Sequence, residues 1–236
     1  MPNYTVSVTG NSTHLHSVLF PPIRLDVNKE WEVALLDFTT FNSIPNIIAG
    51  ENNVFYYGSE ENTSTNEKIV FETGSYELED INRRLKNELG EDTISLVANN
   101  NLLRSELTCK FYVDFSKKDS IGSLLGFSRE QATLKPNEKH LGADTVNIIK
   151  VNVLNITCNI VHGAYNNGSD GHILHSFYPN VGPGYKILER PHNLVYLPIN
   201  VTLISDIVLD VLDQNGEPVD FRGEVITLRL HIKERD

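Results

Sequence analysis

Apolar and polar residues alternate with a period of two through most of this chain, and this alternation restricts the fold more than any other feature. Successive side chains of a β-strand point to opposite faces, so the pattern is typical of strands with one buried face. Clusters of Asn, Gly, Asp and Pro separate the runs. The runs lie at 4–8, 15–20, 31–41, 53–58, 67–73, 93–98, 106–115, 146–161, 171–179, 184–189, 193–199, 204–213 and 224–233.

These runs predict roughly a dozen strands with connections too short for repeated βαβ crossovers. That excludes a Rossmann-type parallel sheet and favours an antiparallel sandwich. A double jelly roll would need about sixteen strands, more than the 236 residues of this chain supply. We therefore expect an all-β protein with a single jelly-roll β-sandwich.

The segments between the strands predict surface loops within one domain. Four of them, 42–53, 58–66, 128–144 and 163–171, are polar and rich in Asn, Gly and Ser. None is long enough to form a second domain. We expect an N-terminal arm with the first strands over 1–30 and a single jelly-roll domain over 31–236, so that the whole chain is one domain.

One segment has the pattern of a helix. Over 75–90, an apolar stripe with helical spacing predicts about three turns at 77–89. Ser75 is a suitable N-cap and Gly90 a suitable residue for the end of the helix. A helix this short needs packing to be stable in water. The stripe consists of Leu78, Ile81, Leu85 and Leu89.

The helix start does not suit a phosphate group. Glu77, Glu79 and Asp80 occupy the first turn, where their carboxylates complement the helix dipole and would repel an anion. We expect the helix to be a clip across one end of the sandwich, between the strands at 67–73 and 93–98. A second, shorter helix is expected over 119–127, ending at Gly126.

The charge balance limits the partners. The chain carries 20 Lys and Arg against 31 Asp and Glu, a net charge of −11, and Lys117 with Lys118 forms only a small basic spot. We therefore expect no direct nucleic-acid binding. The N-terminal sequence lacks the basic and apolar regions of a signal peptide, and no apolar run approaches the roughly 20 residues of a membrane span. A soluble intracellular protein is expected.

The histidines and cysteines are the strongest candidates for a chemical site. His14 and His16 share one face of a strand, as in cupin-type metal sites, but the Glu of such sites does not follow, since the next Glu is Glu30, and the spacing around His192 departs from that family. His172 and His175 are three apart on a predicted strand and so face opposite sides.

Cys109 and Cys158 lie in apolar runs and are expected to be buried free thiols. Neither has an adjacent base, and there is no G-x-S-x-G sequence. We therefore predict no catalytic residue, no metal site, no cofactor and no enzymatic activity.

The order of segments resembles the minor capsid, or penton, proteins of Polinton (Maverick) elements, adintoviruses and virophages. The resemblance covers roughly residues 31–233. The segments are WEVALLDFTTFNSIPNI, GSYELEDINRRLKNEL, SIGSLLGFS, VNIIKVNVLNITCNI, HILHSFYPNVGPGYKILERPHNLVYLPIN and DQNGEPVDFRGEVITLRLHIK.

This resemblance implies a single jelly roll that forms a homopentamer at the fivefold vertices of an icosahedral capsid. The implied partner is a double jelly-roll major capsid protein, and the implied location is the virion, after synthesis in the host cytoplasm or nucleus. The family function carries no catalytic residue. An insertion domain for host contact is left open, but the loops here are short, so no receptor binding is assigned.

Two other functions remain open from the sequence. One is a non-viral carbohydrate-binding or ligand-type jelly roll, and the other is a degenerate cupin-like metalloenzyme. If the chain assembles into a ring, the contacts are expected at strand edges and at loops such as 43–53 and 179–192, because an acidic chain must avoid bringing like charges together.

Overall fold

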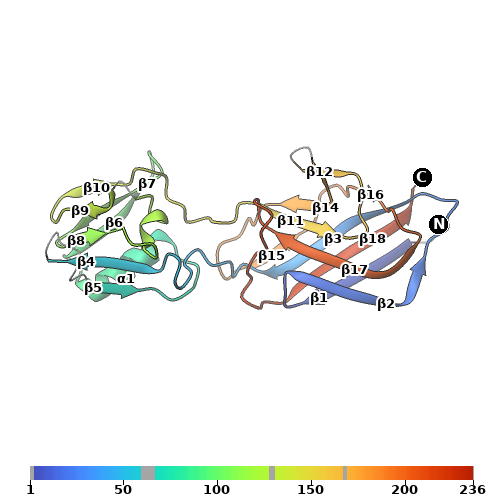
Figure 1. The fold of residues 1–236 in the computed structure, drawn as a ribbon, viewed down its shortest axis with the longest axis horizontal. Coiled ribbons are helices and arrows are strands. Elements are labelled where there is room, and N and C mark those ends of the chain that lie inside the picture. The colour runs from blue at the N-terminus through green and yellow to red at the C-terminus, as the bar shows by residue number, and fades with distance from the viewer. Residues whose placement is uncertain (1–2, 60–66, 128–130, 167–168, 236) are drawn as a thin grey trace. The chain divides into compact units, whose positions relative to one another are not determined.

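A computed structural model of the chain describes residues 3–59, 67–127, 131–166 and 169–235. The chain forms two compact units, one from Met1–Ile44 with Val151–Asp236 and one from Pro45–Lys150 (Figure 1). Each unit has its own hydrophobic core. In place of the single domain expected over 31–236, the structure divides the chain into these two units. The alternation of apolar and polar residues occurs in the strands of both units, so the pattern does not indicate which strands pack in the same core.

Eight strands of the first unit form two facing antiparallel sheets. The first sheet has the order β1 (Asn3–Gly10), β18 (Ile226–Glu234), β3 (Trp31–Phe41) and β15 (Lys186–Glu189). The second has the order β14 (Ile173–Phe177), β11 (Leu154–Cys158), β17 (Leu203–Leu212) and β2 (His14–Arg24). Strands from early and late in the chain interleave in each sheet, as two Greek keys require. The predicted jelly-roll β-sandwich is confirmed.

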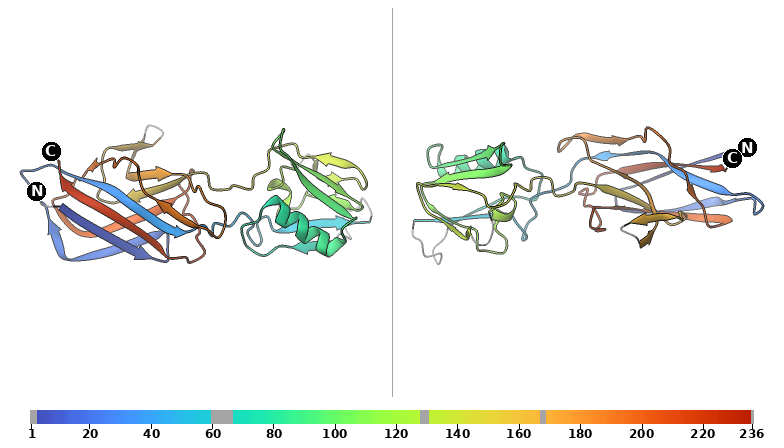
Figure 2. Two further views of the ribbon diagram at one scale, coloured as in Figure 1. Left: turned by 180° about the vertical axis from the view of Figure 1, so that it is seen from behind. Right: turned by 90° about the horizontal axis from the view of Figure 1, so that it is seen from above.

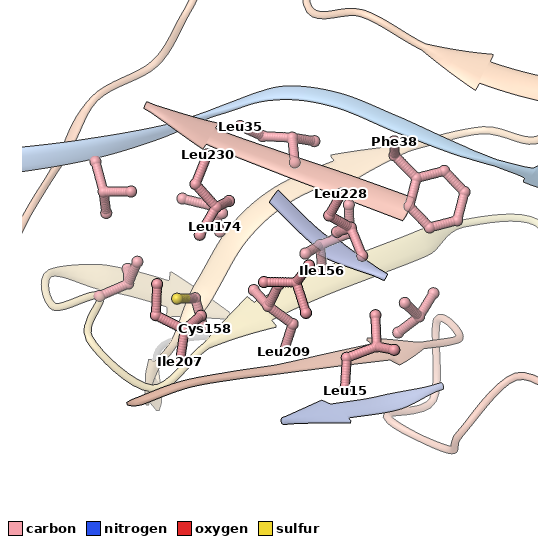
Figure 3. Packing of buried hydrophobic residues seen from close by; sticks show 14 of the residues in the cluster. Leu15, Leu35, Phe38, Ile156, Cys158, Leu174, Ile207, Leu209, Leu228 and Leu230 are labelled. Atoms are coloured by element: carbon pink, nitrogen blue, oxygen red, sulfur yellow. The ribbon is translucent and has the colours of Figure 1, made fainter. Parts of the chain in front are cut away.

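The core of the jelly roll lies between these two sheets. Leu228 and Leu230 point inward from β18, and Ile156 and Leu209 point toward them from the second sheet (Figure 3). All four side chains are fully buried. The alternation in β17 and β18 is thus explained by one face that packs in the core and one that does not.

Smaller strands complete the first unit. The short β16 (Leu197–Pro198) pairs with β3, and β12 (Ala164–Asn166) forms a hairpin with β13 (Ser169–Gly171). At one end of the sandwich, Gly10 lies opposite Ile226. The chain leaves this unit after Ile44, just beyond the end of β3, and returns at Val151, just before β11.

The second unit contains two small antiparallel sheets and a helix. One sheet has the order β5 (Glu67–Val70), β4 (Val54–Gly58), β8 (Tyr112–Asp114) and β9 (Thr133–Leu134). The other has the order β10 (Lys139–Leu141), β7 (Arg104–Cys109) and β6 (Ile94–Asn99). The helix α1 (Leu78–Leu89) packs against β6 (Figure 2), and a short 3-10 helix, η2 (Ile121–Ser123), precedes Gly126.

The predicted helix at 77–89 is confirmed, but its expected cap and place are not. Glu77 is the N-cap, and its backbone amide donates a hydrogen bond to the Asp80 carboxylate in a capping box. Ser75 does not hold that position. Ile81 and Leu85 are buried in the core of the second unit, so α1 is part of that unit and not a clip across the jelly roll.

Several predicted strand runs are shorter in the structure, and two of them are much shorter. The run at 146–161 contains only β11, and the run at 193–199 contains only β16. The described residues form 18 strands, more than the roughly dozen expected. Short strands such as β9 carry too few residues to show alternation. Within the described residues, no helix is long and apolar enough to cross a membrane.

Candidate functional site

His14 and His16 project from the exposed face of β2, as the sequence predicts. His14 Nδ1 lies 2.7 Å from Asp210 Oδ1, and His16 Nε2 lies 3.6 Å from Asp206 Oδ2. Both aspartates belong to the neighbouring strand β17. Each imidazole therefore pairs with its own carboxylate across two strands, which is ordinary stabilisation of a sheet surface.

The other histidines are spread over separate places. His172 Nδ1 lies 2.7 Å from the Val161 carbonyl oxygen, whereas His175 Nε2 lies 3.0 Å from Glu189 Oε1 on β15. His192 is exposed between β15 and β16. In the part of the chain that the structure describes, no group of three or more His, Cys, Asp or Glu side chains is placed to hold a metal ion.

Both cysteines are buried free thiols, as predicted. Cys158 lies in the jelly-roll core and Cys109 in the core of the second unit. Burial raises the pKa of the Cys158 thiol to about 11, and it also raises the pKa of Cys109. A thiol that resists ionisation is a poor nucleophile, so these positions suit packing and not covalent catalysis.

The charged residues singled out in the sequence have local partners. Asp80 bonds to Arg83 on the helix surface as well as capping the helix. Lys117 Nζ lies 4.0 Å from Asp114 Oδ2. The N-terminus of the helix thus carries a carboxylate that accepts hydrogen bonds from the Glu77 amide and from Arg83, and its negative charge disfavours binding of an anion there.

A pocket of about 440 Å³ opens at the end of the jelly roll that contains the chain termini. Trp31, Tyr196 and Ile199 contribute apolar surface to it. Ion pairs line its rim: Lys29 Nζ is 2.8 Å from Glu234 Oε2, and Arg235 is 2.9 Å from Glu30 Oε2. These pairs join the loop before β3 to the C-terminal strand. Exposed pairs of this kind add little stability, and the pocket lining contains no cysteine, serine or histidine nucleophile.

The two loops expected to make subunit contacts differ in how they are used. Much of 43–53 is committed to internal structure, because Asn46 and Asn53 are buried and bond to backbone groups of the second unit. The segment 179–192 is mostly exposed, with Tyr185 and Leu188 open to solvent. The sequence could not separate the two, because both are polar and rich in turn residues.

Comparison with known proteins finds a match in three-dimensional fold and none in sequence. No protein-family model matches the sequence, and no curated protein matches it. Among solved structures, the crystal structure of the selenomethionine-labelled mavirus penton protein matches with a TM-score of 0.52 and 14% sequence identity. The match covers 99% of this chain and 100% of that chain. Along almost its whole length, this chain has the fold of a solved penton protein.

Proposed function

We propose that this chain is a penton, or minor capsid protein, of an icosahedral virion. Five copies form a ring that occupies each fivefold vertex, within a capsid built mainly from a double jelly-roll major capsid protein. The proposal places the chain with the penton proteins of Polinton (Maverick) elements, adintoviruses and virophages. The protein is made in the host cytoplasm or nucleus and then becomes part of the virion.

The observation that carries the proposal is the extent of the structural match. A jelly roll alone is a common fold that hosts many functions. Here the likeness to a penton protein extends over 99% of the chain and all of the other protein, so it includes the unit inserted between β3 and β11. A structural match that includes an inserted unit, even at low sequence identity, is more specific evidence for a common role than a match in the sandwich alone.

The side chains support a role in assembly over a role in catalysis. The thiols are buried, and the histidines that were candidates for a site are dispersed over the jelly-roll surface. Ring formation needs only complementary surfaces, and closed cyclic symmetry lets one flank of a subunit meet the other flank of its neighbour.

Two measurements test the proposal. Light scattering coupled to size exclusion on the purified chain should give the mass of a pentamer. Co-expression with the double jelly-roll major capsid protein of the same genome should then give particles with density at the fivefold vertices, which particles made without this chain should lack. A trimer that binds glycans and never joins such particles would indicate a ligand-type jelly roll instead.

A further inference from the structure

The first two strands of the jelly roll lie in a part of the sequence without formal charge. Residues 1–23 contain no Asp, Glu, Lys or Arg, although 20 basic and 31 acidic residues follow in the rest of the chain. All of β1 and nearly all of β2, up to Arg24, fall within this part. In a protein with a net charge of −11, such a surface is the place where copies repel each other least.

These two strands form one flank of the sandwich. β1 is the edge strand of the first sheet and β2 is the edge strand of the second, and they run along the same margin of the unit (Figure 1). β1 pairs with β18 over eight residues without a register shift, and no described strand pairs with its other side. A regular edge strand with no charge and no proline is open to pairing or close packing with another chain.

The same flank exposes large apolar side chains. Phe20 is 97% exposed and Val18 is 71% exposed, and both lie on the outer face of β2, while Leu15 points into the core. A phenylalanine this exposed is available as an anchor, since aromatic side chains at the centre of an interface carry much of the binding energy. The β1–β2 flank therefore combines an unpaired edge with exposed apolar side chains, and its own strands carry no formal charge before Arg24. Asp206 and Asp210 of the neighbouring β17 pair with His16 and His14 on the outer face.

The opposite flank has matching properties. It is formed by the other edge strands, β14 and β15, which the bond of 3.0 Å between His175 and Glu189 links across the two sheets. Tyr178, Tyr185 and Leu188 are exposed there. Over 171–205 the charged residues are Lys186, Glu189 and Arg190, so two basic residues against one acidic residue give a net charge of +1.

We propose that the β1–β2 flank of one copy docks against the β14–β15 flank of the next copy of this chain. The inference rests on the proposed function and assigns the two faces through which its ring closes. A second copy is the occupant that the charges favour, because a basic partner would be drawn to acidic surface, and the strands of these flanks carry only Glu189 as an acidic residue. Two different flanks make a head-to-tail contact, which can close into a ring.

Charge placed at Phe20 tests the first flank. Phe20→Glu should raise the protein concentration at half-assembly by at least about tenfold, as loss of an interface anchor does. The matched control is Val70→Glu, an exposed valine on the edge strand β5 of the other unit, which should assemble like the parent chain. Protection of the Cys158 thiol from alkylation verifies that the Phe20 variant is folded, and protection of the Cys109 thiol verifies the same for Val70→Glu.

A paired substitution tests whether the two flanks meet. Leu188→Glu alone should also weaken assembly, whereas Phe20→Glu combined with Leu188→Lys should recover at least part of it, because opposite charges then face each other. Assembly of Phe20→Glu at parental concentrations, or equal loss in Val70→Glu, would overturn the inference.

The outcomes separate this inference from the proposed function. A parental pentamer that Phe20→Glu leaves intact overturns the assigned flanks and keeps the penton role. A parental trimer that Phe20→Glu dissociates supports the flanks and counts against a vertex role. A parental chain that stays monomeric at all concentrations and salt levels overturns the flank contact, and co-assembly with the major capsid protein then tests the penton role on its own.

Discussion

The two units are both rich in β-strands, but the chain builds them in different ways. In the jelly roll, Asn3 lies opposite Lys233, so the first and last strands of the chain pair with each other. The second unit is one continuous segment whose beginning and end are held together. The Asn46 amide nitrogen donates to the carbonyl oxygens of Tyr76 at 2.8 Å and Ile148 at 3.0 Å, and its oxygen accepts from the Tyr76 amide.

Because of this difference, folding of the first unit requires two distant chain segments, whereas folding of the second requires one. The jelly roll needs both chain segments, and its long-range pairings must be made against a large loop-closure entropy. The second unit has its own core and bonds its own ends together, so we expect it to fold when the jelly roll does not. Each core contains one buried thiol, Cys158 or Cys109, which reports separately on the unfolding of each unit.

The largest expected effect comes from a charge in the jelly-roll core. Leu209→Asp places a carboxylate at a fully buried position of β17 and should lower the free energy of unfolding of this unit by about 5 kcal/mol. Alkylation followed by mass spectrometry should then label Cys158 readily and leave Cys109 protected. Leu203→Asp, on an exposed part of the same strand, is the control. Simultaneous exposure of both thiols would show that the units unfold together.

The reciprocal change breaks the second unit. Leu85→Asp puts a charge where α1 is buried against β6 and should cost about 4 kcal/mol, with Cys109 exposed and Cys158 protected. Arg84→Asp lies on the exposed side of the helix, where only its pair with Glu88 at 3.0 Å is lost, and should cost less than about 1 kcal/mol. Equal costs for the two changes would mean that the buried face of α1 is wrongly assigned.

A smaller effect tests the closure of the second unit. Asn46→Ala removes an amide that is buried and bonded to three backbone groups, and it should cost about 2 to 3 kcal/mol because those groups lose their partners. Hydrogen exchange should show faster opening of this unit alone. Asn101→Ala, at an exposed loop position, should leave exchange unchanged. If Asn46→Ala opened the jelly roll first, the proposed independence of the units would be wrong.

The smallest effect is a difference in pH dependence. Burial and the hydrogen bond of 2.7 Å to Glu67 raise the pKa of Tyr57 from 10.0 to about 12. Because the neutral phenol is favoured in the folded unit, its contribution to stability is complete below pH 10 and is lost as the pH rises from 10 to about 12. Tyr57→Phe should remove this loss and a late-ionising component of the tyrosinate absorbance. Tyr112→Phe in the same unit should leave that component in place.

Local pattern was sufficient for the features that depend on one face of one element. The alternation in 204–213 and 224–233 identified two core strands, and the stripe from Leu78 to Leu89 identified α1, because burial of a face leaves a periodic trace in the sequence. The apolar runs around Cys109 and Cys158 likewise predicted buried thiols. The resemblance of segment order to penton proteins agrees with the structural match in fold.

Pairing between distant segments was decided only in the tertiary structure. Alternation shows that a strand buries one face but carries no label for its partner, so β3 and β11 could be assigned to one sandwich, and 45–150 to a separate unit, only from three-dimensional contacts. For the same reason, the charge-free run at 1–23 became a flank only when β1 and β2 were seen as edge strands. The sequence determined which residues seek burial, and long-range strand pairing decided with which others they are buried.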